Sequence, residues 1–121
     1  EMASLMKMLR KGEIFTQDAS YRMYKTLGNQ YWDGEGLSQI PEHIKTAYKS
    51  GAVDRSKSEV MFVHAPHGDY VFCMITKNQT DTQWDENNEG YRAARRISSS
   101  LWKYFEPKSK WKLPDGYDKW L

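Results

Sequence analysis

Residues 44–76 read IKTAYKSGAVDRSKSEVMFVHAPHGDYVFCMIT, and this stretch contains every strand that the sequence predicts. Its first segment, Ile44–Ser50, is weakly patterned and is followed by a glycine. The next two segments, Glu59–His64 and Tyr70–Thr76, are rich in β-branched and aromatic residues, and the Pro-His-Gly-Asp sequence at residues 66–69 is typical of a turn. We therefore expect the second and third segments to form a hairpin beside a first, weaker strand.

Apolar residues at three- and four-residue spacing predict helices on both sides of this stretch. Residues 2–9 carry one such stripe, a second helix follows the N-cap Thr16 and ends at Gly28, and a long helix covers Tyr91–Phe105. The apolar face of a helix needs a surface to bury against, and the strands provide one. The predicted fold class is α+β, with an antiparallel three-stranded sheet portion and flanking helices.

Length and composition indicate one folded unit. A chain of 121 residues has room for one core, and 39% hydrophobic and 14% aromatic residues are too many for a disordered segment. The net charge of +2 is too small to indicate a nucleic-acid partner. No apolar stretch approaches the roughly 20 residues that a membrane-spanning helix needs, so we expect no membrane span in this chain.

The single cysteine and the tail carry further expectations. Cys73 has no second cysteine to pair with, and the alternating pattern around it predicts a small buried side chain. The tail from Lys108 to Leu121 has no periodicity, and we expect its tryptophans to pack against the folded part. The chain begins with Glu1 rather than Met, which indicates a processed, truncated or engineered N-terminus.

Lys49-Ser50-Gly51 follows the pattern of the KTG motif, Lys-Ser/Thr-Gly, one of three signatures of penicillin-recognising serine enzymes. The order around it is more specific than the tripeptide: two helices, a loop with Ile40-Pro41, the motif strand, a hairpin and a closing helix. This order resembles the C-terminal part of class A β-lactamases and their relatives over roughly residues 2–106. Glu59, ten positions after Lys49, stands where an acidic residue commonly opens the next strand in that family.

The resemblance implies a role for each motif residue. The ammonium of Lys49 would hold the substrate carboxylate and support proton transfer by its positive field, and the hydroxyl of Ser50 would bind the same carboxylate. Gly51 would let the substrate approach the strand closely. The amide of Ala52 would be one donor of the oxyanion hole. Catalytic Lys49 and substrate-binding Lys49, Ser50, Gly51 and Ala52 form the predicted site, and no metal or organic cofactor is implied.

The nucleophile of such a site is not expected within this sequence. Ser-x-x-Lys occurs at Ser4, Ser100 and Ser109, but in the family the nucleophilic serine lies far upstream of the motif strand, at the start of a buried helix. No Ser-Asp-Asn is present either. Residues 1–107 are thus interpreted as the C-terminal part of a β-lactamase-like domain, with 108–121 as an extension, and the chain alone is expected to be inactive.

Three alternatives stay open beside a β-lactamase that hydrolyses β-lactams through an acyl-enzyme. They are a D,D-peptidase or penicillin-binding protein acting on peptidoglycan, an inactive binding module of the same fold, and an unrelated α+β interaction protein. By the resemblance, the substrate is a β-lactam or a D-alanyl peptide and the location is the periplasm or cell envelope. Because Tyr70–Thr76 is apolar on both faces, we also expect association with the missing N-terminal part or self-association through the sheet.

Other polar residues are weaker candidates. His64 and His67 have the spacing of two metal ligands but no evident third ligand, and His43 is expected at the surface. Three arginines on the long helix, at positions 92, 95 and 96, are expected on a solvated face or in ion pairs. Arg55 and Lys57, which lie between the first two strands, are better placed to bind a carboxylate.

Overall fold

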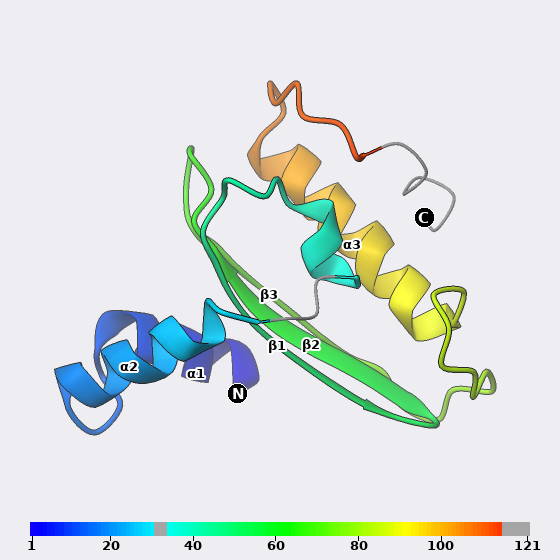
Figure 1. Ribbon diagram of the computed structural model, residues 1–121, viewed down its shortest axis with the longest axis horizontal. Helices are drawn as coiled ribbons and strands as arrows, with labels where there is room; N and C mark the ends of the chain where they lie inside the picture. Colours follow the sequence, from blue (N-terminus) through cyan, green and yellow to red (C-terminus); the bar gives the residue numbers. More distant parts are fainter. Residues whose placement is uncertain (31–33, 115–121) are drawn as a thin grey trace.

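The computed structural model describes residues 1–30 and 34–114. These residues form helices, a 3₁₀ turn and strands in the order α1 (Met2–Lys11), α2 (Gln17–Leu27), η1 (Gly36–Gln39), β1 (Thr46–Val53), β2 (Ser56–Val63), β3 (Tyr70–Ile75) and α3 (Glu89–Phe105). The strands form an antiparallel sheet in the order β1-β2-β3. The α1–α2 pair lies on one side of this sheet, and η1 and α3 lie on the other (Figure 1).

Two apolar cores lie against the two faces of the sheet because side chains alternate along each strand. Tyr48, Met61 and Trp102 belong to the larger core, on the α3 face. Ala47 and Phe62 belong to the smaller core, which α1 and α2 cover. The predicted fold class, with its hairpin and flanking helices, is confirmed.

The first two strands extend further than their sequence pattern indicates. A two-residue turn, Asp54 and Arg55, joins them, and the ammonium of Lys57 donates a hydrogen bond to the carbonyl of Val53 at 2.8 Å. Lys49-Ser50-Gly51 therefore lies inside β1 rather than at its end. Glu59 lies in the interior of β2, so the expectation that it opens this strand is wrong.

The outer strand and the long helix differ from prediction in what they bury. Cys73 is exposed and Ile75 is 66% exposed, so the prediction of a buried thiol is wrong. No strand pairs with the outer edge of β3 in the described part of the chain. On α3 the predicted apolar stripe, Tyr91, Ala94, Ile97, Leu101, Tyr104 and Phe105, is right for Ala94, which is buried, and wrong for Ile97 and Tyr104, which are exposed. Ser98 is buried instead, and its hydroxyl donates to the carbonyl of Gly36 at 2.7 Å.

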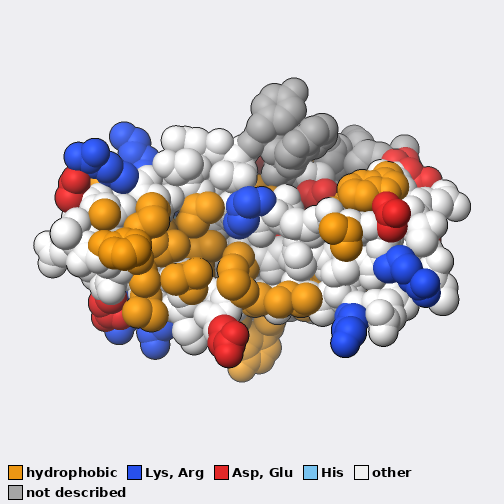
Figure 2. Space-filling model, turned by 90° about the horizontal axis from the view of Figure 1, so that it is seen from below, with side chains coloured by type: hydrophobic (Ala, Val, Ile, Leu, Met, Phe, Trp, Pro, Cys, Tyr) orange, Lys and Arg blue, Asp and Glu red, His pale blue; other side chains and the backbone are white. Residues whose placement is uncertain are grey.

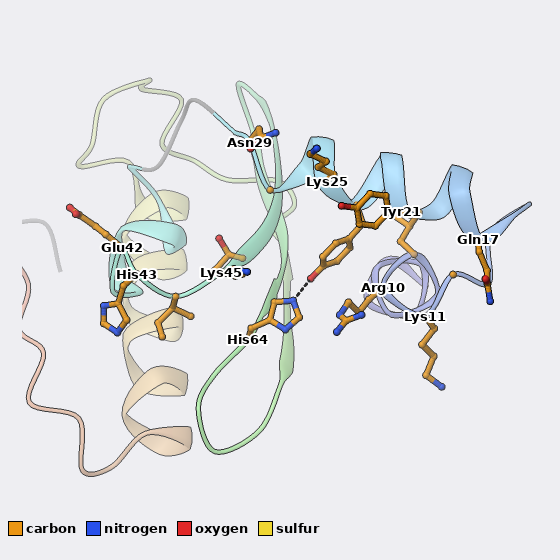
Figure 3. Close-up of a pocket in the computed structure, with 16 residues that line it drawn as sticks. Arg10, Lys11, Gln17, Tyr21, Lys25, Asn29, Glu42, His43, Lys45 and His64 are labelled. Carbon is orange, nitrogen blue, oxygen red and sulfur yellow. Dashed lines mark hydrogen bonds between the residues drawn. The ribbon is translucent and has the colours of Figure 1, made fainter.

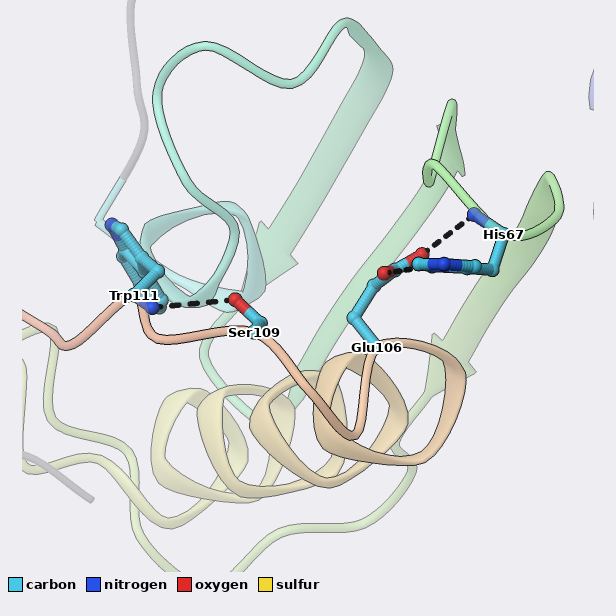
Figure 4. A network of polar contacts seen from close by, with 4 residues as sticks. All are labelled: His67, Glu106, Ser109 and Trp111. Carbon is cyan, nitrogen blue, oxygen red and sulfur yellow. Dashed lines mark hydrogen bonds and ion pairs between the residues drawn. The ribbon is translucent and has the colours of Figure 1, made fainter.

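The first part of the tail folds back onto the protein, as expected for its aromatic residues. The Glu106 carboxylate accepts a hydrogen bond from the amide of His67 at 2.8 Å and contacts its ring nitrogen Nδ1 at 2.6 Å (Figure 4). The amide of Trp111 then donates to the hydroxyl of Ser109, and the indole packs against the larger core. Trp120, which is also expected to pack against the folded part, lies outside the described residues.

A membrane-crossing helix, which must be both long and apolar, is not found in the described ranges 1–30 and 34–114.

Replacing the N-cap Thr16 with Ala is expected to lower the free energy of unfolding by about 1 kcal/mol. The hydroxyl of Thr16 accepts a hydrogen bond from the amide of Ala19 at 3.1 Å, and this bond satisfies a donor that the first turn of α2 leaves free. Thr26→Ala in the same helix is the matched control, since the Thr26 hydroxyl only donates to the carbonyl of Arg22. Equal urea midpoints for the two variants would contradict the cap's contribution.

Candidate functional site

The four predicted site residues lie together on β1, at an edge of the sheet that no strand covers among the described residues. In the register, Lys49 opposes Val60 and Ala52 opposes Lys57. Gly51 and Ala52 are exposed. A β-carbon on Gly51 would lie 3.2 Å from the hydroxyl oxygen of Ser58, a close contact that Ser58 would have to relieve by a small movement.

The backbone groups of Ser50 and Ala52 point away from the sheet, toward the open edge. The amide of His64 donates to the carbonyl of Lys45 at 3.0 Å, which marks these two as a hydrogen-bonded pair. Such pairs alternate along an antiparallel ladder, so the N–H and C=O of Ser50 and Ala52 turn away from β2. Lys57, which opposes Ala52, accordingly directs its backbone toward β3: its amide donates to the hydroxyl of Thr76, and its carbonyl accepts from the amide of Thr76. An acceptor atom could approach both outward amides.

The side chains of Lys49 and Ser50 lie on opposite faces of the sheet. Lys49 is exposed, and its ammonium donates to the carbonyl of Ser50. Ser50 is half-buried and lines a cavity of about 470 Å³ together with Glu35, Tyr91 and Arg95. Lys49 is not among the residues that line this cavity. The two residues are therefore neighbours on β1 with side chains on opposite faces. That both bind the same substrate carboxylate stays a prediction.

A buried carboxylate lies directly behind the motif strand. Glu59, the partner of Ser50, is 4% exposed; its Oε2 accepts a hydrogen bond from the amide of Gly36 at 3.2 Å, and its Oε1 has no hydrogen-bond partner. Burial raises the pKa of Glu59 to about 7, and the hydrogen bond from the Gly36 amide offsets only part of this increase. Glu59 therefore keeps its proton to a higher pH than an exposed glutamate does.

Three polar side chains from other segments lie near Glu59: Tyr48, Glu35 and Arg95. Arg95 is 1% exposed, so its assignment to a solvated face is wrong, and burial lowers its pKa while Glu35 raises it. The hydroxyl of Tyr48 donates to Glu35 Oε2 at 3.3 Å. A signal for the buried carboxylate was present: in β2, Glu59 shares its face with Met61 because residues two apart lie on the same side.

The two cations predicted near a substrate carboxylate lie at the β1–β2 turn, where Lys57 is buried and not free to bind one, while Arg55 is exposed. Lys57 is 1% exposed, and its ammonium lies 4.2 Å from the centre of the Trp84 ring in addition to its bond across the turn. The side chain of Arg55 donates to the carbonyl of Gln79 at 3.0 Å. Both cations instead hold the β1–β2 turn against the loop before α3.

The histidines have separate partners. His64 Nε2 lies 2.8 Å from the hydroxyl of Tyr24 and its Nδ1 lies 3.2 Å from Asp69, whereas His67 contacts Glu106. His43 is exposed, as expected. Within residues 1–30 and 34–114 no group of three or more metal-ligating side chains comes together.

The serines of the three Ser-x-x-Lys sequences lie at exposed positions, on α1, on α3 and in the tail: Ser4, Ser100 and Ser109. The Ser100 hydroxyl donates to the carbonyl of Arg96 at 2.8 Å, the usual backbone contact of a helical serine. None of the three lies on the motif strand.

Solved structures with similar folds include β-lactamases and a penicillin-binding protein. The β-lactamase from Sphaerobacter thermophilus DSM 20745 is 21% identical with a TM-score of 0.75, covering 88% of this chain and 40% of its own. A variant of PBP-A, solved as an acyl-enzyme complex with penicillin G, is 17% identical with a TM-score of 0.72, covering 87% and 38%. The TLA-1 extended-spectrum β-lactamase is 17% identical with a TM-score of 0.70, covering 84% and 39%.

At these identities the likeness shows the fold, and this chain spans about two fifths of the length of the structures it matches. No curated protein matches the sequence. The sequence profile of the Beta-lactamase enzyme family, however, matches residues 1–105. Since this match extends from the first residue to the end of α3, the chain belongs to the β-lactamase enzyme family.

Proposed function

We propose that this chain is the C-terminal part of a serine hydrolase that opens β-lactams through an acyl-enzyme. It supplies the substrate-binding strand, and the nucleophilic serine lies in another part of the protein. The observation that supports the proposal is the pair of outward amides, on Ser50 and Ala52, at an unpaired edge beside Lys49. No residue of this chain is assigned as the nucleophile.

In the proposed reaction the serine oxygen attacks the lactam carbonyl carbon. The carbon–nitrogen bond of the ring breaks, the serine proton ends on the lactam nitrogen, and an ester remains. Negative charge develops on the carbonyl oxygen during the attack, and the amide of Ala52 donates one of the two hydrogen bonds that stabilise it. Water then hydrolyses the ester and releases the product.

The other motif residues bind the substrate in this proposal. The ammonium of Lys49 supplies positive charge at the open edge, and the hydroxyl of Ser50 supplies a hydrogen-bond donor. To reach a carboxylate, the ammonium must exchange its contact with the Ser50 carbonyl for one with the substrate. Gly51 keeps the edge free of side-chain bulk.

A D,D-peptidase that acts on peptidoglycan is the second candidate. It is favoured by the similarity to PBP-A, whose TM-score of 0.73 is close to the 0.75 of the thermophilic β-lactamase. The chemistry up to the acyl-enzyme is shared, so the rate of penicillin release separates the two. Release within seconds indicates a β-lactamase, and a long-lived adduct indicates the peptidase. For either enzyme, we propose a location in the periplasm or cell envelope.

We further propose that the chain associates with the rest of its protein, or with itself, through surfaces that are open here. Hydrophobic side chains gather over the half of the molecule that carries α1 and α2 (Figure 2). They include Met2, Leu5 and Met8, and the unpaired edge of β3 adds Ile75. Sedimentation at micromolar concentration is expected to show a dimer or larger species, and a compact, stable monomer would contradict this.

Ala52→Pro in the complete gene product is expected to slow acylation by a fluorescent penicillin roughly 100-fold, the usual cost of losing one oxyanion donor. Proline removes the outward N–H, and a sheet tolerates it at an edge position whose N–H bonds no neighbouring strand. Ala52→Ser keeps the N–H and is the matched control. Intact-mass analysis measures the adduct with time.

The same measurement tests the proposal as a whole. The 121-residue chain alone is expected to gain no adduct, while the complete product gains one penicillin. An adduct on the isolated chain would place the nucleophile within it. An unlabelled complete product would refute both hydrolase candidates and leave the inactive binding module as the better interpretation.

A further inference from the structure

A large groove lies away from the motif residues of β1, between the two N-terminal helices and the ends of two strands. It has a volume of about 1040 Å³ and is open to solvent. Its walls come from the end of α1, from α2, from residues 42–46 at the start of β1, and from His64 after β2 (Figure 3). None of the four motif residues lines it.

Positive charge converges on this groove from separate parts of the chain. Arg10 and Lys11 come from α1, Lys25 from α2 and Lys45 from the segment before β1, while among the described residues Glu42 is the acidic side chain of the lining. The ring of Tyr24 lies 5.9 Å below the guanidinium of Arg10, and Figure 3 shows Arg10 facing His64 across the groove. Lys11 lies 3.7 Å from the carboxylate of Glu13, so the positive charges left to attract an anion are those of Arg10, Lys25 and Lys45.

A chain of hydrogen bonds holds the polar wall of the groove in place. Asp69 lies 3.2 Å from Nδ1 of His64, and the hydroxyl of Tyr24 lies 2.8 Å from Nε2. The carboxylate therefore favours the proton on Nδ1, and the Tyr24 hydroxyl donates to Nε2. Burial raises the pKa of Tyr24 to about 12, so the phenol keeps its proton at neutral pH. The imidazole is thus oriented by contacts on both of its nitrogens.

From this convergence of cations around an oriented histidine, we propose that the groove binds a phosphate ester. The phosphate lies between Arg10 and Lys45, next to His64, and the rest of the ligand occupies the remaining volume. Arginine binds phosphate oxygens in pairs and lysine binds them as a point charge. Tyr21, which lines the groove and is exposed, offers an aromatic face for the organic part.

A phosphate suits this lining better than a carboxylate does. A phosphate ester carries between one and a half and two negative charges near neutral pH, roughly twice the charge of a carboxylate in one group. It also has three oxygens that accept hydrogen bonds, and the side chains of Arg10, Lys45 and Lys25 can only donate them. Two acidic side chains lie close to these cations, Glu42 in the lining and Asp69 against His64, so the number of hydrogen-bond acceptors, rather than charge alone, favours phosphate.

The proposal is tested by titrating the 121-residue chain with inorganic pyrophosphate at constant ionic strength. Binding is followed by the NMR signals of the His64 ring and by calorimetry. We expect the His64 signals to shift on saturation, and Arg10→Gln and Lys45→Gln each to weaken binding about 10-fold, the effect of one charge-assisted contact. Lys7→Gln is the matched control, because Lys7 is an exposed cation of α1 that does not line the groove.

The outcomes are separable. Equal losses for Lys7→Gln and Arg10→Gln would show that pyrophosphate responds only to net charge, which overturns the site. Citrate bound as tightly as pyrophosphate would overturn the assignment to phosphate. All three positions are exposed, so each variant is expected to fold, and an unchanged far-ultraviolet circular dichroism spectrum verifies this. None of these results depends on penicillin acylation, which tests the separate site on β1.

Discussion

Gly36→Ala is expected to lower the free energy of unfolding by about 3 kcal/mol, the upper part of the range for overfilling a packed interior. A β-carbon at this position would lie 2.3 Å from Oε1 and 2.9 Å from Cδ of Glu59, which is itself buried. The contact cannot relax easily, because η1 is held by the bond from the Gly36 amide to Glu59 and by the bond from Ser98 to the Gly36 carbonyl. Urea unfolding measures the loss.

Two further variants make this prediction specific. Gly34→Ala is the matched control, since a β-carbon there meets nothing within 4 Å, and its unfolding free energy should change little. Shortening the opposing side chain with Glu59→Ala should make the added effect of Gly36→Ala much smaller, because the two residues contact each other. Additive effects in the double variant would show that the steric contact with Glu59 does not cause the loss.

The carboxylate behind the motif strand is also expected to make stability depend on pH. The pKa of Glu59 is about 7 in the folded state, against an ordinary value of 4.5. Between these values the folded state binds more protons than the unfolded state, so the stabilisation is fully present below pH 4.5 and is lost as pH rises through 7. The loss from this group is about 3 kcal/mol, the free-energy equivalent of the shift in its pKa.

Glu59→Gln isolates the effect, because an amide of nearly the same shape does not titrate. The difference in unfolding free energy between the parent chain and this variant should grow between pH 5 and 8 and stay constant above about pH 8. Thermal or urea unfolding at several pH values measures this difference. Parallel pH profiles for the two proteins would show that Glu59 does not change its protonation on folding.

The types and order of the elements follow from sequence because they depend on local patterns. Spacings of two and of three to four residues identify the hairpin and the helices, and the Thr16 cap is found where its residue type predicts it. The position of Lys49-Ser50-Gly51 relative to these elements was sufficient to indicate the family that the sequence profile then matched. The predicted division at residue 107 and the roles of the motif residues stay predictions.

Burial of charged residues could not be predicted in the same way. Arg95 and Lys57 look like surface residues in sequence, but tertiary contacts bury them: Arg95 donates to the carbonyl of Glu86 in the loop before α3, and Lys57 donates to the carbonyl of Val53 across the β1–β2 turn. Cys73 looks like a core residue and is exposed, since no described element covers that part of β3. Periodicity describes which residues share a face and does not determine what lies against that face.

The sequence alone therefore determined the α+β class, the order of its elements and the strand that carries the motif, because neighbouring residues set these through local periodicity. Only the tertiary structure decided which backbone groups of that strand are available. The direction of the Ser50 and Ala52 amides depends on the pairing register with β2, and the groove around His64 depends on the α1–α2 pair meeting residues 42–46 and His64, which are distant from it in sequence. The pairing register of the strands and the meeting of distant segments around the groove arise from long-range packing, which no local sequence pattern encodes.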